Sequence, residues 1–158
     1  MARRPAIIPA SAEHIAHIVA NMRAGDLVEL AAIGRTPQSS LTAALRLSRE
    51  AWTGMIDGVP VCMFGVAPTS MLTPWKGRPW MLGTTALDDN AILFLRRCRP
   101  VVARMLEAFP QLENFVAASN VRAIEWLRWL GFEIHETPID IGLKKVPFHK
   151  FTMERAPL

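Results

Sequence analysis

The chain of 158 residues contains no tyrosine, only two cysteines and no long apolar run. Cys62 and Cys98 lie in apolar segments, which suits buried, reduced thiols and excludes a disulfide scaffold. A membrane-spanning helix needs about 20 consecutive apolar residues, and none is present. The two arginines near the start precede an apolar stretch too short for a signal peptide. We therefore expect a soluble, cytoplasmic protein.

Charge is also modest, because 18 basic and 14 acidic residues leave a net charge of +4. The basic residues are scattered apart from Arg96, Arg97 and Arg99, a cluster typical of a solvated helix face. No basic stripe with interleaved aromatic residues exists, so a nucleic-acid partner is not predicted. His14 and His17, three apart on a predicted helix, could share a metal ion, but no accompanying carboxylate pattern supports a site. No metal centre is predicted.

Hydrophobic residues make up 51% of the chain, enough for a full core, and repeats, long linkers and low-complexity segments are absent. Residues 1–158 are therefore predicted to form a single domain. The first half of the chain predicts a short strand at 5–10, followed by helices over 11–22, 26–34 and 37–50. Two strands around an Asp57-Gly58 turn are predicted within 51–68, then a loop over 73–79 and a strand over 80–87.

The longest helical pattern runs from Asp89 to Phe109, with its apolar residues on one stripe. Pro100 falls on the polar side of that stripe, so one helix kinked at the proline is predicted rather than two helices. A strand over 113–119, a helix over 120–130 and strands over 132–136 and 147–155 complete the chain. The element order is β-α-α-β-β-β-α-β-α-β-β, an α/β or α+β class, in which the β-α-β unit should be parallel.

The stretch "AASNVRAIEWLRWLGFEIHE", residues 117–136, contains the most informative motif. Asn120 can cap the helix that follows it. Gly131 can take the left-handed conformation that ends the helix, and Phe132 can pack inward from the next strand. The inner stripe of the helix is predicted to contain Ala123, Leu127 and Leu130.

With the element order, this motif resembles the GCN5-related N-acetyltransferase (GNAT) superfamily. The matching pattern is N-x-x-A-x-x-aromatic-x-x-x-L-G-F, carried by Asn120, Ala123, Trp126, Leu130, Gly131 and Phe132. The resemblance implies a GNAT-like fold, a mixed and mostly antiparallel twisted sheet of six to seven strands flanked by about four to five helices. It also implies acyl-CoA-dependent transfer of an acetyl or acyl group to a primary amine of a small molecule or a protein.

A narrower resemblance covers nearly all of the chain. The segments "MRAGDLVELAAIGRTPQSSLTAALRLS", "FGVAP", "RPWMLGT" and "FPQLENFV" are similar to small acetyltransferase-like tailed-phage proteins related to internal virion protein A. This likeness implies a phage-encoded protein in the host cytoplasm or the virion.

The GNAT resemblance also implies a site for acetyl-CoA or CoA. In that family the strand before the longest helix pairs with pantetheine through its backbone, and the Asn of the N-x-x-A motif reaches it from the other side. The corresponding cofactor-binding residues in this chain are Leu82, Gly83, Thr84, Thr85 and Asn120.

The catalytic residues are unknown, and the candidates are Glu29, Asp26 and His135. Asp26 and Glu29, three apart on one helix face, could hold a cationic amine or act as a base. Alternatively, they are simply an N-cap and a first-turn acid. His135 could act as a base, although a lone strand histidine is more often only hydrogen-bonded.

Two departures from the family bear on catalysis. Active members follow the strand with a glycine-rich loop that holds the CoA pyrophosphate, whereas "GTTALDDNAI" has no glycine after Gly83 and places Asp88 and Asp89 there. Many members also have a tyrosine, which protonates the leaving thiolate, at the position of Leu127. The alternatives are therefore an acyltransferase and a catalytically degenerate GNAT-fold protein that acts as a virion, assembly or binding module.

The outer face of the same helix carries a large aromatic residue between charges. Trp129 shares this face with Arg122 and Glu125, a composition that binding surfaces favour, so a homodimer or phage-protein contact could form here. Alternatively, the segment "TPIDIGLKK", residues 137–145, folds over Trp129. Trp126, at the edge of the inner face, is predicted to be core.

Overall fold

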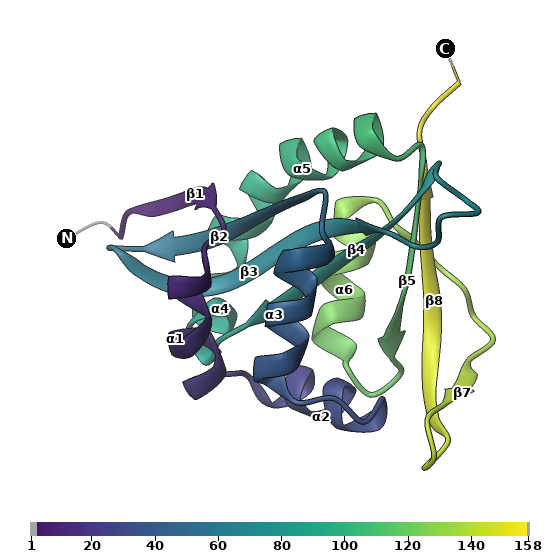
Figure 1. Ribbon diagram of the computed structural model, residues 1–158, viewed down its shortest axis with the longest axis horizontal. Coiled ribbons are helices and arrows are strands. Elements are labelled where there is room, and N and C mark those ends of the chain that lie inside the picture. Colours follow the sequence, from purple (N-terminus) through teal and green to yellow (C-terminus); the bar gives the residue numbers. More distant parts are fainter. Residues whose placement is uncertain (1–2, 158) are drawn as a thin grey trace.

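The computed structural model describes residues 3–157, which form one eight-stranded sheet with helices on both faces (Figure 1). The strand order is β1-β2-β3-β4-β5-β8-β6, with β7 also paired to β8. All pairs are antiparallel except β4 and β5, as the β-α-β pattern predicted. The strands are β1 (Pro5–Pro9), β2 (Glu50–Ile56), β3 (Val59–Pro68), β4 (Lys76–Gly83), β5 (Gln111–Ala117), β6 (Glu133–Ile134), β7 (Ile139–Ile141) and β8 (Val146–Glu154).

The mixed, mostly antiparallel fold class is thus confirmed, and the sheet has eight strands rather than six or seven. The short β7 was not predicted, because three residues are too few for a recognisable alternating pattern. β4 begins at Lys76, within the segment predicted to be a loop. Pro79 falls inside this strand, although it has no N–H to donate to a sheet.

The helices are η1 (Ala12–His14), α1 (Ile15–Ala20), α2 (Ala24–Ala32), α3 (Pro37–Leu47), α4 (Thr85–Asp89), α5 (Ala91–Ala108) and α6 (Val121–Leu130). Two hydrophobic cores lie on opposite faces of the sheet, because the side chains of β3 alternate between them. Cys62 and Phe64 pack with α5 and α6 in the larger core, and Met63 packs with α1 and α3 in the smaller one.

Local signals placed several boundaries correctly. Asp57 and Gly58 both have positive φ, 49° and 80°, as a tight hairpin requires. Asn120 caps α6 by accepting a hydrogen bond from the Ala123 N–H at 3.4 Å. Gly131, with a φ of 105°, ends α6 in the left-handed conformation, and Phe132 is buried after it.

Other boundaries were wrong. The helix predicted from Asp89 begins instead at Ala91, as α5, and residues 85–87, predicted to end a strand, belong to the short helix α4. α5 then runs without interruption through the exposed Pro100, and it buries Phe94, Cys98, Val102 and Met105, as the apolar stripe predicted.

In α6 the one buried residue is Ile124, which was expected to flank the inner stripe. Ala123, Trp126, Leu127 and Leu130 are partly buried and pack against the larger core.

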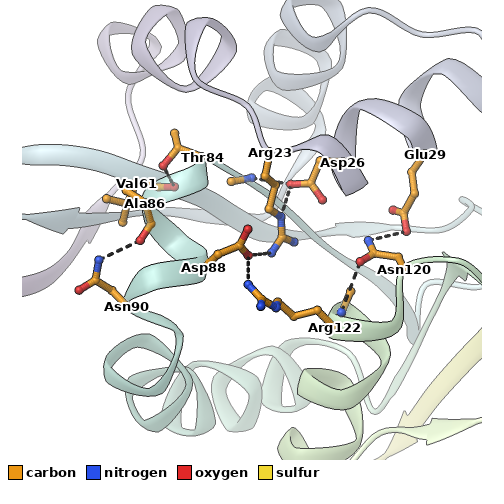
Figure 2. A network of polar contacts seen from close by, with 12 residues as sticks. Arg23, Asp26, Glu29, Val61, Thr84, Ala86, Asp88, Asn90, Asn120 and Arg122 are labelled. Carbon is orange, nitrogen blue, oxygen red and sulfur yellow. Dashed lines mark hydrogen bonds and ion pairs between the residues drawn. The ribbon is translucent and has the colours of Figure 1, made fainter.

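The sheet opens between β4 and β5. These parallel strands pair only at Lys76 with Gln111 and Gly77 with Leu112, and their remaining residues are not paired with one another. The ends of α2, α4 and α6 gather at the far end of this opening (Figures 1 and 2). The opening brings together the polar side chains that form the candidate site.

Candidate functional site

The edge of β4 that faces the opening is bonded to the segment that joins α1 to α2. Thr84 donates its N–H to the Val61 carbonyl of β3 at 2.8 Å. Because the backbone groups of successive strand residues point to opposite edges, the Gly83 carbonyl and the Thr85 N–H point away from β3, toward the opening. The Gly83 carbonyl accepts from the Arg23 N–H at 3.0 Å, and the Thr85 N–H donates to the Asn21 carbonyl at 3.1 Å. Residues 21–23 therefore lie along this edge as a very short antiparallel partner.

Asp26 completes the bonding of Gly83. The Gly83 N–H donates to Asp26 Oδ2 at 2.8 Å, and both groups are buried. Asp26 is the third residue of α2, whose N-cap is Arg23, so the N-cap interpretation of Asp26 is wrong. Thr84 is also buried, and its hydroxyl donates to the Val61 carbonyl at 2.9 Å, on the opposite side of the strand from the opening. Leu82 packs against the smaller core.

Glu29 joins α2 to the other side of the opening. Its Oε1 accepts from the Ala117 N–H at the end of β5 at 2.9 Å and from Asn120 Nδ2 at 3.1 Å. Gly25 allows this close approach, because a Cβ atom there would lie 3.1 Å from the Asn120 amide. Asp26 and Glu29 thus connect one helix to both separated strands. Figure 2 shows the two carboxylates on this helix.

Arg23 supplies the positive charge at the centre of the site, and the sequence interpretation missed it. Its Nε donates to Asp26 Oδ2 at 2.8 Å, and its guanidinium lies 4.9 Å from the ring centroid of Trp126. A second nitrogen lies 3.6 Å from Asp88, which also pairs with Arg122 at 3.4 Å (Figure 2). The arginine three residues before Asp26 was the available signal, because such spacing favours an ion pair.

Burial controls the ionisation of these groups. Desolvation raises the pKa of the Glu29 carboxyl, and the hydrogen bonds from Ala117 and Asn120 only partly offset this effect. Burial alone would lower the pKa of Arg23, but the carboxylates of Asp26, Asp88 and Glu29 together outweigh it, and the net pKa is raised. Arg23 therefore remains charged against Asp26.

The start of α5, where the resemblance places a pyrophosphate, already holds carboxylates. A hollow of about 360 Å³ lies there, lined by Asp88, Asp89, Asn90, Ala91, Ile92, Leu93, Arg122 and Trp126. The Asp88 carboxylate lies between two guanidinium groups. Asn90 Nδ2 donates to the Ala86 carbonyl at 2.8 Å, so that side chain is also engaged within the protein.

These residues do not fit acyl-CoA in the pose that the resemblance implies. The β4 backbone groups that would pair with pantetheine at Gly83 and Thr85 are hydrogen-bonded within the chain. Asp88 and Asp89 would repel a pyrophosphate at the hollow. Of the predicted site residues, the structure gathers Asp26, Glu29, Gly83, Thr85 and Asn120 around the opening.

His135 lies elsewhere. It is exposed after β6, where its Nε2 is 3.2 Å from the Thr152 hydroxyl and its carbonyl is 2.8 Å from His149 Nδ1. Between residues 3 and 157, no three His, Cys, Asp or Glu side chains are arranged to hold a metal ion. Over the same range, no helix is both long and apolar enough to cross a membrane.

Solved structures share this fold along their whole length. An N-acetyltransferase from Staphylococcus aureus Mu50 matches with a TM-score of 0.70 and 13% identity, covering 96% of this chain and 98% of its own. A GCN5-related N-acetyltransferase from Kribbella flavida gives the same four values. AAC(6')-Ib in complex with ribostamycin and coenzyme A also matches at 0.70, with 14% identity and coverage of 96% and 93%.

The chain therefore has the GNAT fold, as predicted. At this low identity the likeness concerns the fold alone. No protein-family model and no curated protein matches the sequence. The narrower resemblance to tailed-phage proteins gains no support from these comparisons.

Proposed function

We propose that this chain uses the GNAT fold as a binding or assembly module and that its own residues close the acyl-CoA cleft. The observation that carries the proposal is the bonding of Gly83, whose N–H and carbonyl are both taken by the start of α2. A pantetheine chain would have to displace the buried Asp26 carboxylate from Gly83. That carboxylate would keep Arg23 as a partner but lose a buried hydrogen bond, which typically costs about 1–3 kcal/mol.

Electrostatics at the start of α5 support the same conclusion. Arg122 lines the hollow, and both it and Arg23 are paired with Asp88, while Arg3 Nη1 donates to Asn90 Oδ1 at the hollow at 2.8 Å. A pyrophosphate in the hollow would therefore meet the Asp88 and Asp89 carboxylates, while Arg23 and Arg122 are already engaged by Asp88 and Arg3 by Asn90. The position at which many relatives carry a tyrosine is Leu127, whose side chain packs against the larger core and has no proton to donate.

A second candidate function is acyl-CoA-dependent N-acyl transfer to a primary amine. The separated β4 and β5 strands favour it, because the opening is retained even though the pairing groups are engaged. Asp26 and Glu29, the carboxylates at the opening, could then hold the cationic amine of a small molecule or a protein. This activity requires residues 21–26 to move away from β4, so that acetyl-CoA can reach Gly83.

The partner surface of such a module would include the outer face of α6. Trp129 is 42% exposed, and the guanidinium of Arg99 lies 3.8 Å from its ring centroid. The same guanidinium donates to the Trp129 carbonyl at 3.1 Å. The residue that packs on the Trp129 ring is therefore Arg99 of α5. This aromatic–arginine pair suits contact with a second copy or another protein in the host cytoplasm or a virion, in keeping with the narrower phage resemblance.

Isothermal titration with acetyl-CoA separates the two functions. The closed cleft predicts no measurable heat of binding at millimolar acetyl-CoA for the wild-type protein. The double variant Asp88→Asn, Asp89→Gly tests the electrostatic part, because it removes both carboxylates. Under the second function it should tighten binding, most of all at low salt, where charges are least screened. Sub-millimolar binding to the wild-type protein, followed by acetyl transfer to an amine, would establish the enzyme instead.

A further inference from the structure

The connection between β3 and β4 displays apolar side chains to solvent. We call residues 69–75 the hairpin tip. Met71 is 98% exposed and Leu72 is 87% exposed, and no charged residue occurs between Ala67 and Trp75. Leu47 at the end of α3 and Trp75 at the base of the tip are also exposed, by 59% and 47%. Figure 1 shows the tip projecting beyond the strands at the edge of the molecule.

The hairpin tip is held in this conformation by hydrogen bonds. The Thr69 N–H donates to the Lys76 carbonyl at 3.2 Å, and the Lys76 N–H donates to the Thr73 carbonyl at 2.9 Å. The Leu72 N–H donates to the Ser70 hydroxyl at 3.0 Å, and the Thr69 and Thr73 hydroxyls lie 3.1 Å apart. The two apolar side chains are thus presented outward by an ordered turn, which lowers the entropy that binding would have to overcome.

A groove lies beside the hairpin tip. Its volume is about 300 Å³, and it is lined by Leu47, Arg49, Pro68, Ser70, Met71, Pro74 and Phe109. Arg49 is the one charged residue of this lining. Its guanidinium lies 5.0 Å from the Phe109 ring centroid, and its Nη1 donates to the Ala108 carbonyl at 3.3 Å. Among residues 3–157, no carboxylate forms an ion pair with Arg49.

We propose that the groove and hairpin tip dock a segment of a partner protein that presents one bulky apolar side chain next to a carboxylate. The apolar side chain would enter the groove between Phe109 and Met71, and the carboxylate would pair with Arg49. Leu72 would cover the bound segment from outside. This surface shares no residue with the opening between β4 and β5, so the proposal is independent of the proposed function.

The chemistry of the lining favours this occupant over two others. In a two-fold contact between copies the same patch meets itself, so each Arg49 would meet a surface with no carboxylate. Binding to an anionic membrane takes a cluster of several cations at the surface, whereas this groove has one. A concave groove also suits an inserted side chain better than a lipid surface.

The test begins with a library of short random peptides, displayed on yeast and selected on the full-length protein. We expect enrichment of peptides with Leu, Phe or Met beside Asp or Glu. Fluorescence anisotropy with one enriched peptide, made synthetically, then compares variants. Met71→Ser with Leu72→Ser should weaken binding at least about tenfold, because both apolar contacts are lost. Arg49→Gln should weaken it about two- to fivefold, as expected for an exposed ion pair, and Arg49→Lys should recover part of the loss.

Arg97→Gln, at an exposed position of α5, is the matched control and should leave peptide affinity unchanged. Thermal unfolding should show the same midpoint for the tip variant and the wild-type protein, because both tip side chains are exposed. The proposal would be overturned by selection without an apolar–acidic preference or by equal affinity for the tip variant. Two further results would also overturn it. One is tip-dependent sedimentation with phosphatidylcholine–phosphatidylserine vesicles, and the other is a concentration-dependent dimer in sedimentation that the tip variant abolishes.

Discussion

Arg23→Met is the substitution that most sharply tests the polar network at the opening. Arg23 is 7% exposed and its Nε contacts Asp26 at 2.8 Å, so its removal leaves a buried carboxylate without a cation. Breaking a buried ion pair on one side typically costs about 3–5 kcal/mol. Methionine keeps much of the length and the apolar contact with Trp126, so the loss should come mainly from charge. Asp88 retains its pairing with Arg122 at 3.4 Å, so the loss of its contact with Arg23 should add little to the destabilisation.

Urea unfolding, followed by circular dichroism, would measure this loss. The double variant Arg23→Met, Asp26→Asn should recover most of the stability, since asparagine can still accept the Gly83 N–H without a charge. Arg104→Met is the control, because the Arg104–Glu50 contact is shorter, at 2.6 Å, but lies at the surface. Exposed pairs contribute little, so this control should unfold almost as the wild-type protein does.

The pH dependence of the single variant has a definite sign. Burial already raises the pKa of Asp26 despite the opposing effect of Arg23, and removing this cation raises it further, so the folded variant prefers the neutral carboxyl. The penalty should therefore shrink as the pH falls from neutral toward the unfolded pKa and grow as it rises through the folded pKa. If Arg23→Met costs no more than Arg104→Met at neutral pH, the reasoning about a buried network is wrong.

Three further substitutions test other parts of the structure. Glu29→Gln keeps both accepted hydrogen bonds but removes a buried charge with a raised pKa, so it should stabilise the protein at neutral pH and lose that advantage at acidic pH; a gain that is independent of pH would contradict this. Pro100→Ala should restore the helical hydrogen bond that a proline cannot make in α5 and cost little or stabilise, and a loss above ~2 kcal/mol in urea unfolding would mean that the packing of α5 depends on the kink predicted at this proline. Trp126→Ala should cost about 3 kcal/mol, since the side chain is partly buried against the core, while Trp129→Ala should leave monomer stability nearly unchanged and weaken self-association or partner binding in sedimentation. Equal destabilisation by the two tryptophan substitutions would exclude the contact surface.

The sequence predicted the features that depend on neighbouring residues. The Asp57-Gly58 hairpin, the Asn120 cap and the Gly131 terminus are local devices, and the structure confirms each of them. The buried stripe of α5 follows from helical periodicity alone. These local signals, together with the element order, were enough to predict the GNAT fold.

The polar network could not be predicted in the same way, because its contacts join distant parts of the chain. Asp26 and Gly83 are 57 positions apart, and Glu29 and Ala117 are 88 apart. No local pattern reveals that residues 21–23 lie along β4 or that Arg23 is buried. The sequence did place Asp26 and Glu29 on one helix face, but not the backbone groups that they contact.

The bonding of Gly83 is the central claim, and its backbone amide reports on it directly. A nitrogen–proton NMR spectrum of labelled protein, recorded during hydrogen exchange and during titration with acetyl-CoA, would follow that single signal. A closed cleft predicts that the Gly83 amide exchanges slowly and that millimolar acetyl-CoA leaves its shift unchanged. Rapid exchange of Gly83 in the free protein, or a saturable shift with acetyl-CoA, would contradict the account and show that the cleft is open to the ligand.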